Sequence, residues 1–254
     1  MLHYEISGKG RETLVLLHGF MENLEIWDDM MPHLSEDFQL VKVDLSGFGK
    51  SAPIAEIQTM ELFADEIKKL TDHLEINKFH LLGHSMGGYI SLAFAEKFPE
   101  LLKSFTLFFS TYFEDDDEKK SIREKSLRLI EENYKAYASA GIPNFFGPDA
   151  RRILKNKIQL AKEIAYTANV NGVLASQKGM KYRPNRKSVL EQFDGLILLI
   201  EGRFDNAVNA IKTIVELPER NNIKAYLLNS GHNGHWEKPS ICAEIINTEL
   251  LNGK

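Results

Sequence analysis

Cysteine is nearly missing from this chain: its 254 residues contain one, Cys242. A single cysteine excludes a disulfide bond within the chain. Cys242 stands between Ile241 and Ala243, and such an apolar setting is typical of a packed core residue and not of a nucleophile. Because a chain without disulfide bonds suits a reducing compartment, we expect a cytoplasmic protein.

Long apolar runs are also missing. The longest strongly apolar run, Leu196 to Ile200, is far shorter than the roughly 20 residues that span a bilayer. The segment 1–20 has no basic start followed by a long apolar stretch and a small-residue cleavage site, so it does not resemble a secretory signal. We therefore expect a soluble protein that is not exported.

The third absence is an excess of positive charge. Lys and Arg total 31 against 36 Asp and Glu, which gives a formal charge of -5 at pH 7. This balance offers no general attraction to nucleic acids or to anionic membranes. We expect small-molecule or protein partners, and the oligomeric state stays open.

What the chain does contain is a regular alternation of apolar patterns. Hydrophobic residues make up 43% of it, enough for the core of one large α/β domain or two small ones. Apolar residues recur at helical spacing, as at Phe63, Ile67 and Leu70 after a candidate N-cap at Thr59. Short apolar runs predict strands at 2–6, 14–17, 40–43, 79–82, 105–109, 196–200 and 225–228. The alternation predicts a mostly parallel central sheet with helices on both faces, whose strands after the first are buried on both sides.

The alternation is interrupted once, between residues 110 and 187. This segment contains helical patterns and no convincing strand, and the strand pattern resumes after it. We therefore predict a core domain formed by residues 1–109 and 188–254. Residues 110–187 are predicted to form a helical cap inserted over the sheet.

A polar turn, Gly-His-Ser-Met-Gly-Gly at 83–88, follows one predicted strand and leads into a mostly apolar helix. A turn this sharp exposes one side chain above the sheet edge, and glycines at 83 and 87 avoid the clash that a Cβ atom would cause. Ser85 occupies the exposed position. A serine hydroxyl also needs a base within hydrogen-bonding distance and donors for a developing oxyanion. The Met86 amide, which opens the helix, is one candidate donor.

The pentapeptide Gly83 to Gly87 resembles the G-x-S-x-G nucleophile elbow of the α/β-hydrolase fold superfamily. Further motifs follow in the order typical of that family: HGF at 18–20, DLSGFGKS at 44–51, GRFD at 202–205 and LNSGH at 228–232. The resemblance covers nearly the whole chain. It implies the α/β-hydrolase fold with a helical cap inserted after the sixth strand, and a capped, esterase-like serine hydrolase.

The resemblance also implies the site residues. Ser85 is the nucleophile, His232 the general base, and Asp205 the acid that orients the imidazole. The oxyanion hole is formed by the backbone N–H groups of Phe20 and Met86. This chemistry requires no metal and no organic cofactor.

Two of these assignments have competitors. His235 lies in the same loop as His232, but the family's tail motif H-x-x-x-x-E-x-P matches from His232. Some members of the family carry the acid one strand earlier. This chain has no carboxylate there until Glu114.

The substrate pocket is the least determined part of the site. Phe145 and Phe146, in a break between predicted cap helices, and Trp236 are candidate pocket residues, with packing inside the protein as the alternative. His18 and His84 stand beside the predicted site residues. We interpret both as structural.

The implied reaction is hydrolysis of a small ester or similar acyl compound through an acyl-enzyme intermediate. Segments 18–27 and 231–239 also resemble the menaquinone-pathway synthase of the same fold, a lyase that eliminates pyruvate. That enzyme calls for an arginine directly after the elbow's paired glycines, where this chain has Tyr89. A ligand-binding receptor with vestigial hydrolysis is a further alternative. The physiological substrate and its acyl chain length stay open.

Overall fold

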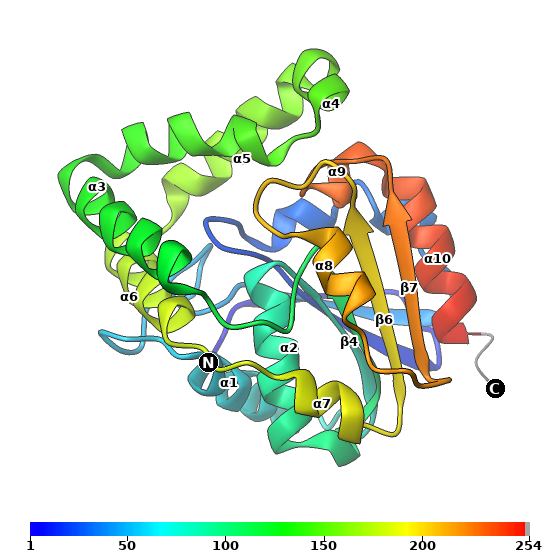
Figure 1. Cartoon of the computed structure of the whole chain (residues 1–254). Coiled ribbons are helices and arrows are strands. Elements are labelled where there is room, and N and C mark those ends of the chain that lie inside the picture. Colours follow the sequence, from blue (N-terminus) through cyan, green and yellow to red (C-terminus); the bar gives the residue numbers. More distant parts are fainter. Residues whose placement is uncertain (252–254) are drawn as a thin grey trace.

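The core of the molecule is a sheet of seven strands in the order β1-β3-β2-β4-β5-β6-β7 (Figure 1). The computed structural model describes residues 1–251. The strands are β1 (Tyr4–Ser7), β2 (Glu12–Leu17), β3 (Phe38–Val43), β4 (Phe79–His84), β5 (Leu102–Phe108), β6 (Leu196–Gly202) and β7 (Ile223–Leu228). Neighbouring strands pair in parallel except β1, which is antiparallel to β3. The predicted mostly parallel sheet is confirmed.

Burial explains why most strands are continuous apolar runs in the sequence. Every residue of β4 is buried, as are nearly all residues of β5 and β6, because helices cover both faces of the sheet. The prediction that 225–228 is buried on both sides is wrong. It belongs to the edge strand β7, whose residues are exposed or half-buried.

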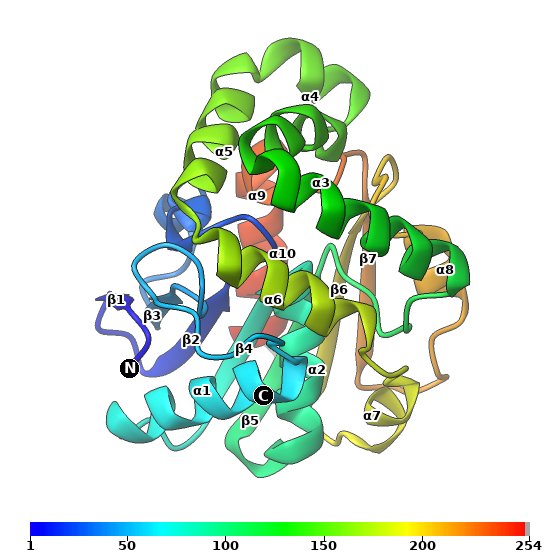
Figure 2. The ribbon, with the colours of Figure 1, turned by 90° about the vertical axis from the view of Figure 1, so that its left-hand side faces the viewer.

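Helices cover the two faces of the sheet. Helices α1 (Met60–His73), α2 (Met86–Lys97) and α7 (Lys187–Gln192) lie on one face, and α10 (Pro239–Leu251) lies on the other (Figures 1 and 2). The N-cap predicted at Thr59 is confirmed, because its side chain accepts a hydrogen bond from the Leu62 amide at 3.3 Å. The remaining core helices are short: α8 (Ala210–Val215), α9 (Gly234–Glu237), and the 3-10 turns η1 (Leu24–Trp27), η2 (Met31–His33) and η3 (Pro99–Leu101).

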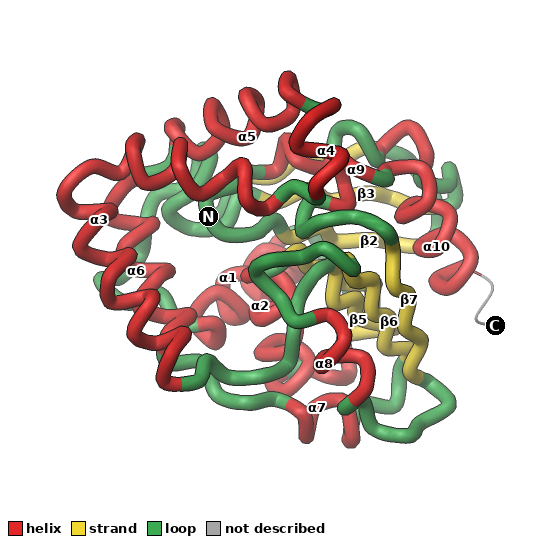
Figure 3. Tube along the Cα trace, turned by 45° about the horizontal axis from the view of Figure 1, so that its top comes forward, coloured by secondary structure: helices red, strands yellow, loops and turns green. Residues whose placement is uncertain are grey.

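Between β5 and β6 the chain leaves the sheet and forms a helical layer over one end of it. We call α3 (Asp117–Gly141), α4 (Pro148–Ile153), α5 (Lys155–Thr167) and α6 (Val170–Lys181) the inserted helices; η4 (Ile142–Phe145) joins the first two. They stand beyond the end of the sheet toward which β6 and β7 point (Figures 1 and 3). The prediction that the insertion follows the sixth strand is wrong. It follows the fifth, because within the described residues only β1, β2 and β3 precede the elbow strand β4.

The inserted helices are fixed to the core through α6. The Asn169 amide donates to the Gly47 carbonyl at 3.1 Å, and the Gln58 amide donates to the Ala175 carbonyl at 3.0 Å. A Cβ atom on Gly172 would lie 2.4 Å from the Gly47 Cα atom, so the helix and the loop approach as closely as two glycines allow.

Two further observations concern the molecule as a whole. Within residues 1–251, no helix has the length and apolar character needed to cross a membrane. In the same range, no group of three or more His, Cys, Asp or Glu residues is placed to hold a metal ion.

Cys242 is buried in α10, and burial raises the pKa of its thiol to about 12, which agrees with the packing role expected for it.

Candidate active site

Ser85 stands at the junction between β4 and α2 with a strained backbone. Its φ of 50° and ψ of -111° lie in a region that side-chain-bearing residues rarely adopt. The surrounding structure holds this conformation: the Ser85 amide donates to the Phe108 carbonyl at 3.0 Å, and the Ser110 hydroxyl donates to the Ser85 carbonyl at 2.7 Å. The elbow is thus anchored to the end of β5 and to the loop that follows it.

Close backbone contacts explain the glycines on either side of Ser85. A Cβ atom on Gly83 would lie 2.1 Å from the carbonyl oxygen of Gly87, and one on Gly87 would lie 2.5 Å from that of Leu17. Any larger residue at either position would force the turn apart. The elbow therefore requires the glycines that the sequence places there.

Asp205 and His232 come together from the loops after β6 and β7. The Nδ1 atom of His232 lies 2.6 Å from Oδ2 of Asp205, and both side chains are almost fully buried. The other carboxylate oxygen of Asp205 accepts hydrogen bonds from the amides of Ala207 and Val208, at 2.7 and 3.0 Å. Burial alone would lower the pKa of His232, but the charge of Asp205 and the hydrogen bond to it outweigh burial, and the pKa is raised.

His235 does not take this place. Its side chain is fully buried, its ring centroid lies 4.8 Å from that of His84, and neither ring nitrogen has a hydrogen-bond partner within residues 1–251. Burial and the neighbouring histidines lower its pKa well below the usual value, so its ring is neutral. Of the two candidate histidines, the structure pairs His232 with the acid.

Hydrogen bonds to the segment between α3 and α4 also hold the loop before α9. The His232 amide donates to the Phe145 carbonyl at 2.7 Å, and the two rings are 5.5 Å apart. Glu237 accepts hydrogen bonds from the amides of Gly231 and Gly147, which joins this loop to the start of α4. Movement of the inserted helices would therefore move His232.

Glu22 and His84 form a largely buried pair beside Ser85 that the sequence does not reveal. Nδ1 of His84 lies 2.8 Å from Oε2 of Glu22, and its Nε2 lies 3.0 Å from the backbone carbonyl of His232. Both ring nitrogens of His84 thus lie within hydrogen-bonding distance of an oxygen atom. Burial alone would raise the pKa of Glu22, but the charge of His84 and its hydrogen bond lower it to about 2.

The same carboxylate organises the loop that carries Phe20. Oε2 of Glu22 accepts the Gly19 amide at 2.6 Å, and His18 bonds to the Gly19 carbonyl at 2.7 Å and to the Leu45 amide at 3.0 Å. His18 thus braces the loop, as expected. A Cβ atom on Gly19 would lie 3.2 Å from that of Ser85, so loop and elbow are in close contact.

The two backbone groups considered for the oxyanion hole are both available. Within residues 1–251, neither the Phe20 amide nor the Met86 amide donates a hydrogen bond to a protein acceptor. Met86 is the first residue of α2, where helix N–H groups have no acceptor within the helix.

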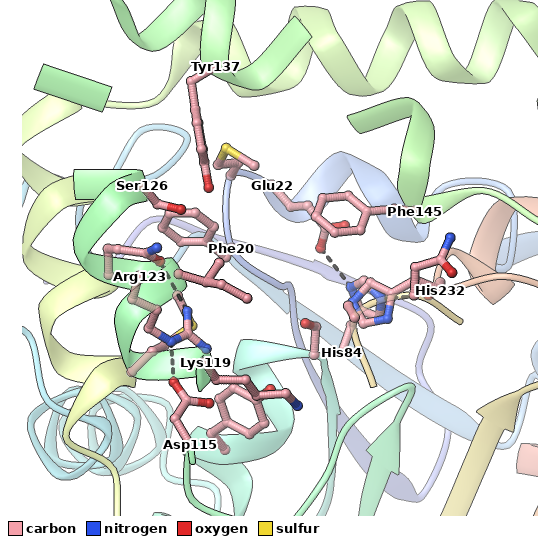
Figure 4. A pocket seen from close by; sticks show the side chains of 18 residues that line it. Phe20, Glu22, His84, Asp115, Lys119, Arg123, Ser126, Tyr137, Phe145 and His232 are labelled. Atoms are coloured by element: carbon pink, nitrogen blue, oxygen red, sulfur yellow. Dashed lines mark hydrogen bonds and ion pairs between the residues drawn. The ribbon is translucent and has the colours of Figure 1, made fainter. Parts of the chain in front are cut away.

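A cavity of about 270 Å³ separates the core from the inserted helices. Ser85, His232, Phe20 and Phe145 line it, together with Lys119 and Arg123 from α3 (Figure 4). Two of the three candidate pocket residues lie outside it. Phe146 is fully buried and stacked on Trp236, with ring centroids 5.9 Å apart, and Trp236 borders a small side cavity of about 20 Å³. The reason is that Phe146 follows the end of η4 and turns into the interior while Phe145 faces His232.

Comparison with known proteins places the chain among hydrolases. A profile of the alpha/beta hydrolase fold matches residues 12–239. A putative 2-succinyl-6-hydroxy-2,4-cyclohexadiene-1-carboxylate synthase of Bacillus subtilis is 27% identical over 99% of this chain and 96% of that protein. The structure of a thermophilic esterase from Thermogutta terrifontis, with malate bound, is also 27% identical, with a TM-score of 0.92 over 99% of this chain and 93% of the other.

A further relative matches over a shorter stretch. The acetyltransferase component of an acetoin cleaving system from Pseudomonas putida is 38% identical over 104 residues, which is 41% of this chain and 28% of that protein. The chain thus spans well under two thirds of that relative's length.

Proposed function

The chain belongs to the alpha/beta hydrolase family, and from that premise we propose that it hydrolyses a small ester or similar acyl compound through a Ser85-His232-Asp205 triad. The observation that carries the proposal is the buried His232-Asp205 pair, whose imidazole borders the same cavity as the strained Ser85. The esterase relative supports a hydrolytic enzyme in general terms. A cavity of about 270 Å³ lies at the lower limit of ordinary ligand pockets and favours a small substrate.

In the first half of the proposed reaction, Ser85 Oγ attacks the ester carbonyl carbon and Nε2 of His232 takes the hydroxyl proton. The carbonyl oxygen becomes an oxyanion that accepts hydrogen bonds from the amides of Phe20 and Met86. When the intermediate collapses, the bond to the alcohol oxygen breaks, and His232 returns the proton to the leaving alcohol. The acyl group remains on Ser85.

In the second half, a water molecule replaces the alcohol. It gives a proton to His232 and attacks the acyl carbon, and the serine oxygen leaves with that proton, which releases the carboxylic acid. Asp205 stays ionised throughout and stabilises the imidazolium formed in each half. We propose that the inserted helices act as a cap, whose part is to exclude bulk water and to limit which acyl groups enter.

Short-chain p-nitrophenyl esters test this proposal. The protein should release p-nitrophenol with burst kinetics, and Ser85→Ala should lower kcat by about 10^4 to 10^6. Ser240→Ala, an exposed serine of α10 that does not line the cavity, is the control and should retain activity. Turnover that survives in Ser85→Ala would contradict the proposed nucleophile.

A lyase reaction is the second candidate, and the similarity to the putative synthase along almost the whole chain favours it. The same His232-Asp205 pair would then act as a base for an elimination. The position after the paired glycines holds Tyr89 and not the arginine that the resemblance calls for. Release of pyruvate from that synthase's substrate, with feeble turnover of simple esters, would favour the lyase over the hydrolase.

A further inference from the structure

The cavity wall formed by α3 and α6 carries charges for which the proposed hydrolysis has no use. Asp115, just before α3, is 1% exposed and forms ion pairs with Arg123 and with Arg183, the latter at 2.8 Å. Lys119 lies one turn further along α3 and borders the cavity together with Arg123. In Figure 4, Asp115, Lys119 and Arg123 lie on one side of the cavity, and His232 and Phe145 lie on the other.

Positive charge exceeds negative charge at this wall. Three basic side chains, Lys119, Arg123 and Arg183, face one buried carboxylate, Asp115, so basic groups outnumber acidic ones by two. Burial lowers the pKa of Lys119, and the charge of Asp115 opposes this effect. The carboxylates of residues 116–118 are exposed to water, where charges are screened. Arg183 is itself 3% exposed and lies over the Tyr89 ring at 4.0 Å from its centroid, so this cluster is a buried, fixed feature and not a mobile surface patch.

Several donors of this wall have no acceptor in the protein. The Nε atom of Arg123 donates to Asp115, and its Nη1 atom donates to Oε1 of Gln177 at 3.1 Å. Its Nη2 atom has no hydrogen-bond partner among residues 1–251. Within the same residues, the Lys119 ammonium group and the Ser126 hydroxyl have none either. All three side chains border the cavity. A partly buried wall with an excess of basic side chains and free donors is suited to an anionic group of a ligand.

We propose that this wall binds a free carboxylate of the substrate, which makes the substrate an ester of a small dicarboxylic acid or a similar acidic acyl compound. The inference rests on the proposed hydrolysis at Ser85. The scissile carbonyl lies at Ser85, the free carboxylate lies against Lys119 and Arg123, and the chain between them packs on Phe20 and Phe145. The wall thus discriminates between acyl groups of equal length by their charge.

Matched pairs of ethyl esters test the proposal. Monoethyl succinate, glutarate and adipate are compared with ethyl butanoate, pentanoate and hexanoate, and the released ethanol is measured. We expect at least one acidic ester to exceed its neutral partner in kcat/KM by about tenfold or more. Lys119→Met should lower that ratio by about ten- to hundredfold, because it removes a charge-assisted hydrogen bond. Lys125→Met, an exposed residue of the same helix, should leave the ratio unchanged.

A binding measurement separates this inference from the proposed reaction. In Ser85→Ala, glutarate should raise the melting temperature, and the rise should vanish when Lys119→Met is added. Hydrolysis of both ester series at equal rates would overturn the carboxylate site and leave the hydrolase proposal intact. Glutarate stabilisation that depends on Lys119, without hydrolysis of any ester, would support the site and overturn the hydrolase proposal. A rise that survives Lys119→Met would overturn the site.

Discussion

At the residue scale, the charge of Asp205 acts on His232 across 2.6 Å. The proposed base must be neutral to accept a proton, so kcat/KM should rise with pH as His232 loses its proton. Because Asp205 raises the pKa of His232, Asp205→Asn should shift this rise to lower pH. It should also lower kcat by about 10^4, since the asparagine holds the imidazole in the wrong tautomer.

A pH profile of kcat/KM checks this expectation. The control is Asp194→Asn, a fully exposed carboxylate before β6, which should leave both the rate and the profile unchanged. Protonation of His232 has opposite effects on the two properties: it lowers activity and raises the stability of the fold. A histidine whose pKa is raised by folding stabilises the fold below its unfolded pKa of about 6.5, and that contribution is lost as the pH rises through the folded value. A profile that Asp205→Asn does not shift would contradict the pairing.

The pair of Glu22 and His84 supports a stability prediction at the same scale. Glu22→Gln keeps the shape but removes the charge that faces His84 and the Gly19 amide. We expect the free energy of unfolding at pH 7 to fall by about 1–3 kcal/mol, the usual contribution of a hydrogen bond to a charged group. The pKa of Glu22 is lowered to about 2, so its contribution is present above the unfolded pKa of about 4.3 and is lost as the pH falls toward 2.

Urea unfolding at several pH values measures the difference between the native protein and Glu22→Gln. The exposed Glu36→Gln is the control and should differ from the native protein by less than about 0.5 kcal/mol. A Glu22 effect of constant size from pH 7 to pH 3 would contradict a contribution from the charge of Glu22.

The residues of this site differ in how far sequence could predict them. Ser85, Asp205 and His232 stand in motifs whose order along the chain is characteristic, so their roles could be proposed before their geometry was known. Glu22 could not be recognised, because an acidic residue in a loop is usually solvated and nothing local marks it as buried against His84. A pairing across 62 residues depends on the folded backbone.

At the element scale, the segment that joins η4 to α4 contributes two neighbouring phenylalanines with different environments. Phe145 borders the cavity, and Phe146 is fully buried against Trp236. We expect Phe146→Ala to lower the free energy of unfolding by about 3–5 kcal/mol, as large-to-small changes in a core do. Phe145→Ala should cost less stability and should shift the preference for acyl chain length.

Two measurements on each variant separate these effects: urea unfolding, and kcat/KM across p-nitrophenyl esters of increasing chain length. Each variant serves as the control for the other, since the side-chain deletion is the same. The assignment fails if Phe145→Ala leaves the chain-length profile unchanged, or if Phe146→Ala reshapes it without loss of stability.

The positions of the strands were predicted better than the surroundings of individual side chains. The apolar runs located all seven strands to within a few residues of their observed bounds. For the strands inside the sheet the reason is that buried parallel strands need continuous apolar sequence. The position of the insertion relative to the strand count was wrong, since that count came from a resemblance and not from this chain. Phe145 and Phe146 could not be distinguished, because the change of direction after η4 is made by backbone angles that the sequence does not reveal.

At the scale of the whole molecule, burial is distributed unevenly between the core and the inserted helices. All residues of β4 are buried, whereas α4 contains no buried residue and α5 buries only four, Ile158, Ala161, Ile164 and Ala165. Free energies of local opening follow such differences, from near zero in poorly packed segments to the global value in a core. Helices α4 and α5 should therefore open more readily than the strands β4 and β6, which lead to Ser85 and Asp205.

Hydrogen exchange followed by mass spectrometry tests this expectation for α4 and α5. Their amides should exchange well before those of β4 and β5, and a phosphonate attached covalently to Ser85 should slow exchange in α3 and α6, which border the cavity with Lys119, Arg123 and Met180. Helix α10 packs on the face of the sheet opposite α1 and α2 (Figure 1) and is the internal control. Equal exchange in the inserted helices and the sheet would contradict a layer that opens separately. Protection that extends equally to α10 would mean that the ligand stabilises the molecule as a whole, and the inserted helices would then not act as a cap over the site.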